Sequence, residues 1–386
     1  MVPEETNITI VGGGIGGLTA AVALKQKGFQ VQVIEQAPDF QPIGAGITMQ
    51  INAMQAFQRI GLADEIMAAG NSLNRLILRW SSGKEIFTSH MEQFRQEFGA
   101  PFIGIHRAKL HEVLLAALPE DTVEMNCRIE SVSESDNRVS LTATDGKQFE
   151  TDAVIGADGL NSQVRKHLWG DEPMRYTGLT SWRGILDNPN ITPTDEAGEY
   201  WGKSKIFGYV PLGDNVLYWF TTQLAEEGGQ DQGNNARDAV LQTLDDWHSP
   251  IKQWVEQTKP ENIIRTDIRD RPPRFPWGKG RITLLGDAAH PMTPNLGQGG
   301  GQAVEDAVVL AATLARAADP VSGFQDFEKR RHPRTKKIVQ DSRTFSSLAH
   351  GSSLLMRFAK HWMFPFMPTS YRHRQLREIF RFQCDD

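Results

Sequence analysis

The stretch from Asn7 to Gly17, NITIVGGGIGG, decides the fold of this chain. Its first five residues form a β-branched run that predicts a strand, and six residues follow of which five are glycine. The segment from Leu18 to Lys27 has the apolar spacing of a helix, and Gln30 to Ile34 alternates as a second strand that ends at Glu35. The order strand, glycines, helix, strand and acid is typical of a nucleotide-binding βαβ unit.

The glycines match the pattern G-x-G-x-x-G at Gly12, Gly14 and Gly17. The first glycine permits the tight turn, the second lets a pyrophosphate approach the backbone, and the third lets helix and strand pack closely. Glu35 follows 35 − 17 = 18 residues after the last glycine, where its carboxylate can accept hydrogen bonds from a ribose 2′-hydroxyl. A carboxylate there disfavours a 2′-phosphate, so NAD and FAD remain as candidate ligands.

A second glycine-rich stretch, GDAAHPMTPNLGQGGG, runs from Gly286 to Gly301. It follows a predicted strand, Ile282 to Leu285, and precedes a predicted helix, Ala303 to Ala317. Asp287 can accept hydrogen bonds from hydroxyl groups, and the helix dipole favours negative charge near the backbone N–H groups of residues 297–301. The stretch predicts a site for an oxygen-rich, partly anionic ligand, and a glycine-rich surface loop is the alternative.

Composition narrows the class of protein. A chain of 386 residues is too long for one simple core, and 23% charged with 39% hydrophobic residues is typical of a globular protein. The formal charge of 41 − 47 = −6 argues against nucleic acid as a partner. Cys127 and Cys384 are the only cysteines, which predicts no disulfide framework and no metal site. We expect a cytoplasmic protein without a transmembrane segment, because no long uncharged apolar run is present.

A third motif, DAVIGADGLNSQVR, runs from Asp152 to Arg165. It reads as an apolar strand that ends in an acid–glycine turn. With the other two motifs, and in this order, it resembles the group A flavoprotein monooxygenases, the family of para-hydroxybenzoate, salicylate and urate hydroxylases and zeaxanthin epoxidase. The likeness covers roughly residues 7–345.

The resemblance implies an α/β fold with three parts. An FAD-binding, Rossmann-like domain of the glutathione reductase type is expected from residues 1–72, 100–175 and 272–345. A mixed β-sheet substrate domain, residues 73–99 and 176–271, is inserted into it, and residues 346–386 form a helical tail. The implied cofactor is non-covalent FAD. NAD(P)H is expected to bind only transiently, since the chain has no second dinucleotide fingerprint.

The resemblance also implies roles for single residues. Glu35 would hold the adenosine ribose, and Asp287 would hold the ribityl hydroxyls. Arg107 and Asp158 would lie near the ribityl–pyrophosphate region, and Asp158 is also implicated in NAD(P)H use. Pro294, through its carbonyl, would lie near the reacting flavin carbon and the substrate. The implied FAD-binding set is Gly12, Gly14, Ile15, Gly16, Gly17, Glu35, Gln36, Gly46, Ile47, Arg107, Ile129, Asp158, Asp287, Gly297, Gln298, Gly299, Gly300 and Gly301. Gly44 stands where some relatives have an arginine, and we expect it and Gly46 to give the loop mobility.

Candidate substrate residues lie on aromatic-rich strands predicted from Thr180 to Leu186 and from Ile206 to Thr222. Alternation places Tyr218 and Phe220 on one face of a strand and Trp219 on the other. Arg183 lies in mid-strand, where it would either bind a substrate anion or pair with an acid at the sheet edge.

The function implied is hydroxylation of an electron-rich small molecule, expected to be aromatic, with NAD(P)H and O₂, through a flavin C4a-hydroperoxide. An epoxidase or hydroxylase of a polyene or quinone-like lipid, a prenyl reductase of the same superfamily, and a flavin-binding module without activity are the alternatives. A flavin-dependent halogenase is disfavoured because its W-x-W-x-I-P signature is absent.

The C-terminal tail carries the segment WMFPFMP, Trp362 to Pro368, close to Arg372, Arg374 and Arg377. Residues 329–381 hold 13 Lys and Arg against 2 acids, a balance of 13 − 2 = +11. The apolar segment would either pack on the protein or touch a membrane surface weakly. A monomer and a dimer are both compatible with the sequence.

Overall fold

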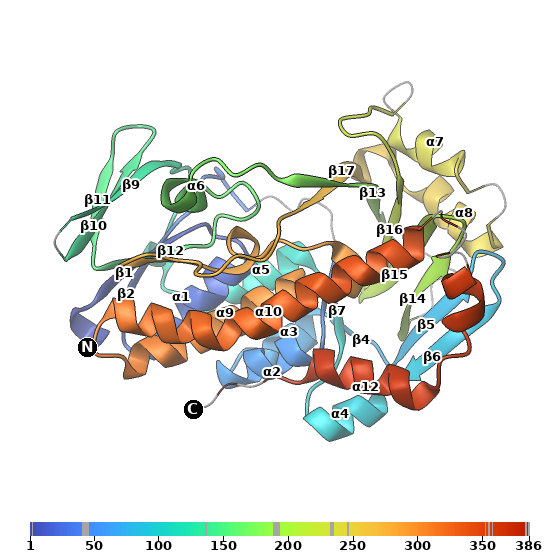
Figure 1. The fold of residues 1–386 in the computed structure, drawn as a ribbon, viewed down its shortest axis with the longest axis horizontal. Coiled ribbons are helices and arrows are strands. Elements are labelled where there is room, and N and C mark those ends of the chain that lie inside the picture. The colour runs from blue at the N-terminus through green and yellow to red at the C-terminus, as the bar shows by residue number, and fades with distance from the viewer. Residues whose placement is uncertain are drawn as a thin grey trace.

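The structure is a computed structural model that describes residues 1, 3–40, 46–135, 137–187, 194–231, 235–244, 247–351, 353, 356, 358–382 and 384. Gly44, which the sequence suggested as a mobile loop residue, lies outside the described residues. Within them, the predicted α/β class is confirmed, with a parallel sheet at one end of the molecule and a larger mixed sheet at the other (Figure 1).

The parallel sheet is built around the strand predicted first. β1 pairs in parallel with β2 on one side and with β12 on the other. The five strands, in sheet order, are β18 (Ile282–Leu284), β12 (Ala153–Gly156), β1 (Asn7–Val11), β2 (Gln30–Ile34) and β8 (Val123–Glu124). Both faces of this parallel sheet are covered, and accordingly all four residues from Ile8 to Val11 are buried, with Thr9 the one polar residue among them.

Helices cover this sheet and form the main core with it. α1 packs on α9, and the long helix α10 runs along the molecule from the parallel sheet toward the mixed sheet (Figure 1). The helices around the sheet are α1 (Ile15–Gln26), α2 (Ile51–Arg59), α3 (Ala63–Ala69), α5 (Arg107–Ala116), α6 (Gln163–Trp169), α9 (Gly299–Arg316) and α10 (Pro320–His350). Helix α9 is buried along most of its length, so the glycine-rich stretch before it is held on a rigid element.

Two small sheets flank the parallel one. The antiparallel sheet β11-β10-β9 consists of Gln148–Thr151, Arg138–Ala143 and Ile129–Ser135. The sheet β3-β7-β4 consists of Gly46–Met49, Ile103–His106 and Asn71–Ser72. The second of these connects the two ends of the molecule, because β3 and β7 contact β15 of the mixed sheet.

The mixed sheet has seven strands, with β14 and β5 parallel and the other pairs antiparallel. In sheet order they are β17 (Ile263–Asp270), β13 (Arg175–Asp187), β16 (Val216–Leu224), β15 (Lys205–Gly213), β14 (Glu196–Trp201), β5 (Arg75–Trp80) and β6 (Glu85–His90). Its covered face packs on α7 (Ala236–Leu241) and α8 (Ser249–Gln257) through stacked Phe207, Trp219 and Trp254. The predicted alternation is confirmed, since Trp219 is buried and Tyr218 and Phe220 are half-buried on the opposite face.

The tail runs back from the mixed sheet toward α2. After the π-helix η7 (Ala359–Met363), helix α12 (Thr369–Phe380) lies beside α4 (Glu92–Phe98) (Figure 1). Phe380 is fully buried against Phe94 and Phe102. Arg334 donates hydrogen bonds to the carbonyls of Glu378 and Ile379, which satisfies two C-terminal acceptors of α12. No helix among the described residues is long and apolar enough to cross a membrane.

Candidate functional site

Two glycines let the backbone close tightly at the nucleotide end. Gly12 has φ +108°, and a Cβ there would lie 2.4 Å from the carbonyl oxygen of Ala157. A Cβ on Gly17 would lie 2.0 Å from the carbonyl oxygen of Gly12. Neither position accepts a side chain, so β1, β12 and the start of α1 approach one another only with glycine at both.

Gly14 differs, because a Cβ there would meet nothing within 4 Å. It is the N-cap of α1, and no side chain caps this helix end. The first N–H groups of a helix have no partner within the helix, and the dipole there attracts anions. The space in front of Gly14 is therefore suited to a pyrophosphate.

Glu35 is held rigidly at the end of β2. Its Oε2 accepts the N–H of Gly13 at 2.6 Å and its Oε1 accepts the N–H of Ala37 at 2.8 Å. Each carboxylate oxygen can accept a further hydrogen bond, so the group remains able to bind ribose hydroxyls. It lines a cavity of about 200 Å³ whose other predicted residues are Gly12, Gly14, Gln36, Ile129 and Asp158. Cys127, Arg128 and Gln163 also line it, and none of these three residues was predicted to bind FAD.

Asp158 carries an unused acceptor into the same cavity. Its Oδ2 accepts the N–H groups of Gln163 at 2.7 Å and Val164 at 3.2 Å, at the start of α6. Its Oδ1 is enclosed and has no partner within the described residues. Burial raises the pKa of Asp158, although its hydrogen bonds oppose this. An enclosed acceptor beside an open glycine cradle fits a ligand that brings hydroxyl donors, as FAD does.

The second half of the site is arranged around Asp287. This residue follows β18 in the turn η5 (Gly286–Ala288), and its Oδ1 is 3.8 Å from where a Cβ of Gly299 would lie. Desolvation by the surrounding protein raises the pKa of the Asp287 carboxyl, while the charges of His290 and Arg107 oppose this shift. Burial lowers the pKa of Arg107 at the start of α5, and Arg183 lowers it further, whereas Asp287 and Tyr218 raise it. Arg107 therefore interacts electrostatically with Asp287, Arg183 and Tyr218.

Helix α9 begins earlier than its apolar pattern predicted. Gly299, Gly300 and Gly301 form its first turn, with Gln298 as the N-cap, so the expectation that the helix begins after Gln302 was wrong. Glycine is poor inside helices but costs less in a first turn, whose N–H groups have no intrahelical partner. The backbone donors that were predicted to face the flavin therefore include the N–H groups of the first turn of α9.

Two close contacts connect the N-terminus of α9 to the mixed sheet. A Cβ on Gly300 would lie 2.8 Å from Cδ1 of Ile47, and a Cβ on Gly46 would lie 2.5 Å from Cβ of Tyr218. Residues predicted to flank the flavin thus lie beside a residue predicted to bind substrate. Pro294 begins the short helix η6 (Pro294–Leu296) between Asp287 and α9, and it is exposed.

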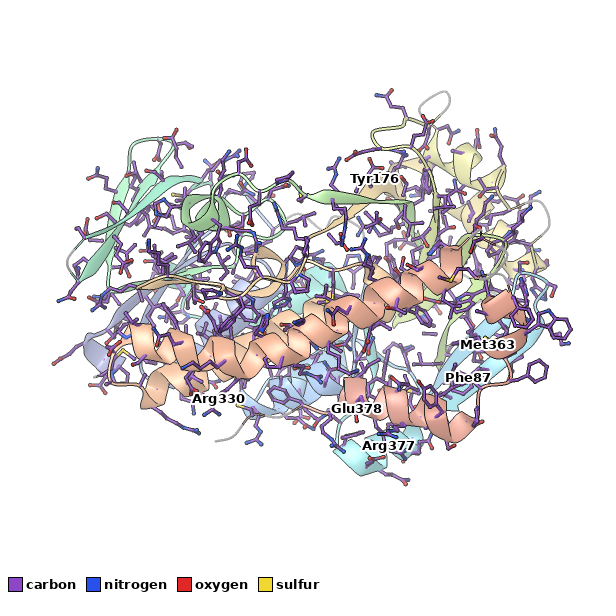
Figure 2. The ribbon with its side chains drawn as sticks, viewed as in Figure 1. Phe87, Tyr176, Arg330, Met363, Arg377 and Glu378 are labelled. Carbon is purple, nitrogen blue, oxygen red and sulfur yellow. The ribbon has the colours of Figure 1, made fainter. Side chains whose placement is uncertain are left out.

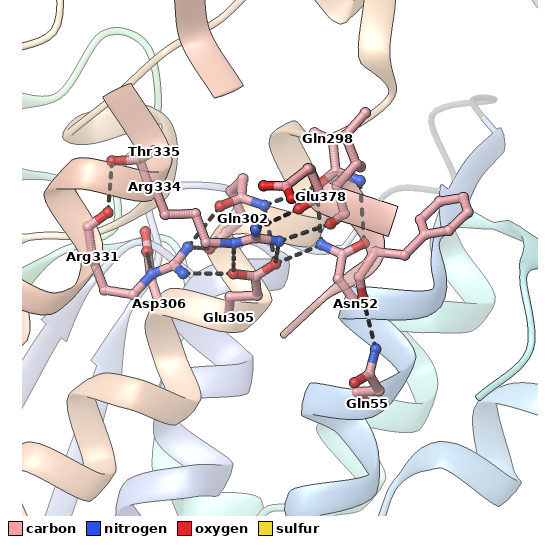
Figure 3. Close-up of polar contacts among 12 residues, drawn as sticks. Asn52, Gln55, Gln298, Gln302, Glu305, Asp306, Arg331, Arg334, Thr335 and Glu378 are labelled. Atoms are coloured by element: carbon pink, nitrogen blue, oxygen red, sulfur yellow. Dashed lines mark hydrogen bonds and ion pairs between the residues drawn. The ribbon is translucent and has the colours of Figure 1, made fainter. Parts of the chain in front are cut away.

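A buried polar network lies behind the site, and the sequence motifs did not predict it. The side chain of Gln298 faces this network, where it contacts Gln50, Asn52 and Gln302 (Figure 3). Glu305 accepts hydrogen bonds from Asn52 and from two arginines of α10, Arg331 and Arg334. The sequence did contain a signal for this network. Two adjacent acids lie within the apolar helix α9, and two arginines lie three residues apart on α10.

The face that carries candidate substrate residues lies on β13 and β16. Arg183 is directly opposite Phe220, and Ile185 opposite Tyr218, so these side chains share one side of the sheet. Arg183 donates to Oγ1 of Thr266 at 2.9 Å, and its enclosed Nε has no partner within the described part of the chain. Burial raises the pKa of Tyr218 to about 12, with Arg183 and Arg107 opposing. The predicted acid partner of Arg183 is not found among the described residues.

A metal centre is not indicated. In the described ranges, no three His, Cys, Asp or Glu side chains are grouped so that they could hold an ion.

Comparisons with known proteins show the family to which this chain belongs. A family model described as an FAD binding domain matches residues 5–342. The aurachin C monooxygenase/isomerase of Stigmatella aurantiaca is 42% identical over 335 residues, which cover 87% of this chain and 87% of that protein. The 6-hydroxynicotinate 3-monooxygenase of Bordetella bronchiseptica is 32% identical over 349 residues, covering 88% and 91%. The crystal structure of Klebsiella pneumoniae HpxO with FAD and uric acid superposes with a TM-score of 0.92 at 27% identity, covering 98% and 97%.

Proposed function

Because this chain belongs to the FAD binding domain family and is an FAD-dependent monooxygenase, we propose that it hydroxylates an electron-rich aromatic or heteroaromatic anion. The observation that carries this proposal is the position of Arg183. Its guanidinium has no carboxylate partner among the described residues and lies on the same side of the sheet as Tyr218 and Phe220. A cation beside aromatic surface suits a flat substrate with an acidic group.

The names of similar proteins support this substrate class. Hydroxynicotinate is the substrate named for one relative, and uric acid is bound in a structural neighbour. Both molecules are heteroaromatic and acidic.

We propose these cofactor contacts. The start of α1 and Gly14 would hold the pyrophosphate, Glu35 the adenosine ribose, and Asp287 the ribityl chain. The backbone of residues 297–301 would face the flavin ring. When bound, FAD supplies the electron transfer from NAD(P)H and the activation of O₂, neither of which a side chain can provide. The N-terminal dipole of α9 would stabilise negative charge on the nearest edge of the ring.

The chain's own residues would orient the substrate and exclude water from it. A pKa of about 12 keeps Tyr218 protonated at neutral pH. Its hydroxyl would therefore donate a hydrogen bond to the substrate and would not remove a proton from it. We therefore propose that residues 1–72, 100–175 and 272–345 bind the cofactor and that residues 73–99 and 176–271 bind the substrate. The last cofactor boundary falls inside α10, which ends at His350.

The test is NAD(P)H consumption by FAD-loaded protein, screened against aromatic acids and their neutral amides. We expect acids to accelerate oxidation and to yield a product that carries oxygen-18 from ¹⁸O₂. Oxidation that is faster with an acid but leaves no label in the product would indicate a reductase or an uncoupled oxidase, and would contradict hydroxylation.

A lipid-like substrate is the second candidate, because one segment of the tail exposes large apolar side chains. Figure 2 shows Met363 at the edge of the molecule, where it projects outward. The exposed set within the tail is Phe358, Trp362, Met363, Phe366 and Tyr371. We propose weak membrane contact here only if the substrate is a polyene or quinone-like lipid. Sedimentation with vesicles of mixed anionic and neutral lipids, compared between the native chain and Trp362→Ser with Phe366→Ser, tests this.

A further inference from the structure

One row of residues crosses the mixed sheet on the side that carries the candidate substrate residues. In register, Arg183 is opposite Phe220, Phe220 opposite Gly208, Gly208 opposite Glu199, and Glu199 opposite Leu78. Residues directly opposite one another on neighbouring strands share a face of the sheet. We call these five residues the middle row. Glu199 was not predicted as a site residue, yet it belongs to the same row as Arg183.

The row on one side of the middle row is covered by the small sheet β3-β7-β4. It contains Ile185, Tyr218 and Val210, which are opposite one another in register. A Cβ on Gly46 of β3 would lie 2.5 Å from Cβ of Tyr218, and a Cβ on Gly104 of β7 would lie 2.7 Å from Cγ1 of Val210. This row is therefore in contact with the part of the chain that is proposed to bind the cofactor.

The row on the other side is covered by the end of α10 and by the tail. It contains Thr222, Ile206 and Trp201, all of which are buried. The ring of Trp201 stacks on Phe364 with 5.1 Å between the centroids, and Oγ1 of Thr222 lies 2.7 Å from Nε2 of His350. The tail thus closes this edge of the face.

The middle row itself keeps accessible surface. Arg183, Phe220 and Glu199 are each half-buried, although covered rows lie on both sides of them. Phe220 supplies a flat apolar surface, because a Cβ on Gly208 would lie only 2.1 Å from Cζ of Phe220. The phenyl ring therefore extends over Gly208, the neighbour of Glu199. A flat ligand that lies on this ring would have Arg183 at one end and Glu199 at the other.

Glu199 has an unused hydrogen-bond acceptor. Its Oε2 accepts Nε1 of Trp201 at 2.9 Å, whereas its Oε1 has no partner in the part of the chain that the structure describes. The ammonium of Lys360 donates to the carbonyls of Gly202 at 2.8 Å and Ala349 at 2.6 Å. Desolvation raises the pKa of Glu199 to about 7, against the effects of Trp201 and Lys360. Above that pH the carboxylate can accept a further hydrogen bond.

The distance between the two polar ends restricts the size of the ligand. Arg183 on β13 and Glu199 on β14 are three strand spacings apart, which is roughly 14 Å between their backbones. Arg183 also leans away from Glu199, because it donates to Thr266 on β17, the neighbour of β13 on its other side. A single aromatic ring is too short to contact both ends, whereas two fused rings reach further along the row.

We propose that Glu199 determines substrate specificity by accepting a hydrogen bond from an O–H or N–H group at the end of the substrate opposite to its anionic group. The proposal rests on the proposed function, which places the anionic group at Arg183. The substrate class is then a fused-ring aromatic anion with a hydroxyl or a ring N–H at its far end. An analogue without this donor would leave the Glu199 carboxylate desolvated and unpaired, and that cost produces the discrimination.

The test uses FAD-loaded protein and two probes, 6-hydroxy-2-naphthoate and 6-methoxy-2-naphthoate. The probes differ only in whether the group opposite to the carboxylate can donate a hydrogen bond. Calorimetric titration at about pH 8, where the carboxylate form of Glu199 dominates, measures binding without turnover. The variants are Glu199→Leu and Glu199→Gln. The matched control is Glu196→Gln on the same strand, whose side chain points to the opposite face and contacts Tyr209.

We expect the native holoprotein to bind the hydroxy probe roughly 10-fold more tightly than the methoxy probe, or better. Glu199→Leu should abolish this preference. Glu199→Gln keeps a neutral acceptor and should retain part of it, and the control should retain all of it. A structural role for Glu199 would weaken both probes equally. That result, a preference that survives in Glu199→Leu, or no binding of the hydroxy probe to the native holoprotein would overturn the inference.

Turnover separates this inference from the proposed function. With the hydroxy probe as substrate, we expect KM to rise roughly 10-fold in Glu199→Leu while FAD content is retained. If the native protein shows the binding preference but incorporates no oxygen-18 into any aromatic acid, the proposed function fails and recognition by Glu199 stands. If aromatic acids are hydroxylated but Glu199→Leu has the same probe preference as the native protein, recognition by Glu199 fails and the proposed function stands.

Discussion

Nε2 of His290 lies 2.6 Å from Oδ2 of Asp306, and the same carboxylate oxygen accepts the N–H of Gly286 at 3.1 Å. The other oxygen of Asp306 accepts Nε of Arg331 at 2.6 Å. Asp306, a buried residue of α9, thus links the turn that contains Asp287 to the second long helix, α10. This geometry makes Asp306 a structural determinant of the proposed cofactor site, although we do not expect it to touch the cofactor.

Replacing Asp306 with Asn should strongly destabilise the protein. It leaves the buried guanidinium of Arg331 with weaker acceptors, and loss of one partner in a buried ion pair costs about 3–5 kcal/mol. The control is Asp326→Asn, which breaks an exposed pair with Arg330 on α10 and should cost about 0–1 kcal/mol. Urea unfolding of the three proteins measures both values. Equal effects of the two substitutions would show that the buried contact is not needed.

Stability should fall in acid, in part because of the same residue. Burial disfavours the charge on Asp306, but His290 and Arg331 outweigh it and lower the pKa to about 2. A carboxyl whose folded pKa is depressed stabilises the protein above its ordinary pKa, which is 3.8. That contribution is lost as the pH falls from about 4 toward 2. Unfolding free energies measured through this window should fall less steeply in Asp306→Asn than in the native chain.

Gly14→Val should give a folded protein with little FAD. The structure has no atom within 4 Å of the new Cβ, so the side chain would project into the space suited to the pyrophosphate. The contrasting variant is Gly17→Ala, whose Cβ would lie 2.0 Å from the Gly12 carbonyl and should impair folding itself. Flavin absorbance after acid precipitation, which releases non-covalent FAD into the supernatant, measures occupancy. Full occupancy in folded Gly14→Val would place the pyrophosphate elsewhere.

Asp287→Ala should weaken FAD binding by about 10- to 100-fold, because a hydrogen bond to a charged group contributes about 1.5–3 kcal/mol. Fluorescence titration of apoprotein with FAD gives the affinity. Asp121→Ala, an exposed acid in the short helix η2 (Glu120–Thr122), serves as the control and should bind FAD normally. An unchanged affinity in a folded Asp287→Ala protein would remove this residue from the proposed site.

Arg183→Met should discriminate between charged and neutral substrates. If Arg183 pairs with a substrate anion, the variant should lose about 10- to 100-fold in apparent affinity for aromatic acids and much less for their amides. Arg269→Met, on β17 of the same sheet and paired with Glu227, controls for loss of charge. Equal losses for acids and amides would assign Arg183 to the scaffold.

The local motifs were readable because their residues are neighbours in the chain. The strand Asn7–Val11, the glycines and Glu35 form a single unit within residues 7–35, so short-range rules were enough to predict it. The limits of α9 were not readable in this way. Apolar periodicity begins at Ala303, whereas the hydrogen-bonded helix begins at Gly299, because glycines carry no periodic signal.

The sequence by itself determined the α/β fold class and the family, and through the resemblance to that family FAD as the cofactor, since the resemblance depends on motifs whose members lie close together. Only the tertiary structure decided which distant groups meet. It brings Tyr218 against Gly46, leaves Arg183 without an acid among the described residues, and gathers Arg165, Arg271 and Arg274 around Glu172. The physical reason is that charge pairing and close packing depend on distances in space, and separation along the chain does not encode those distances.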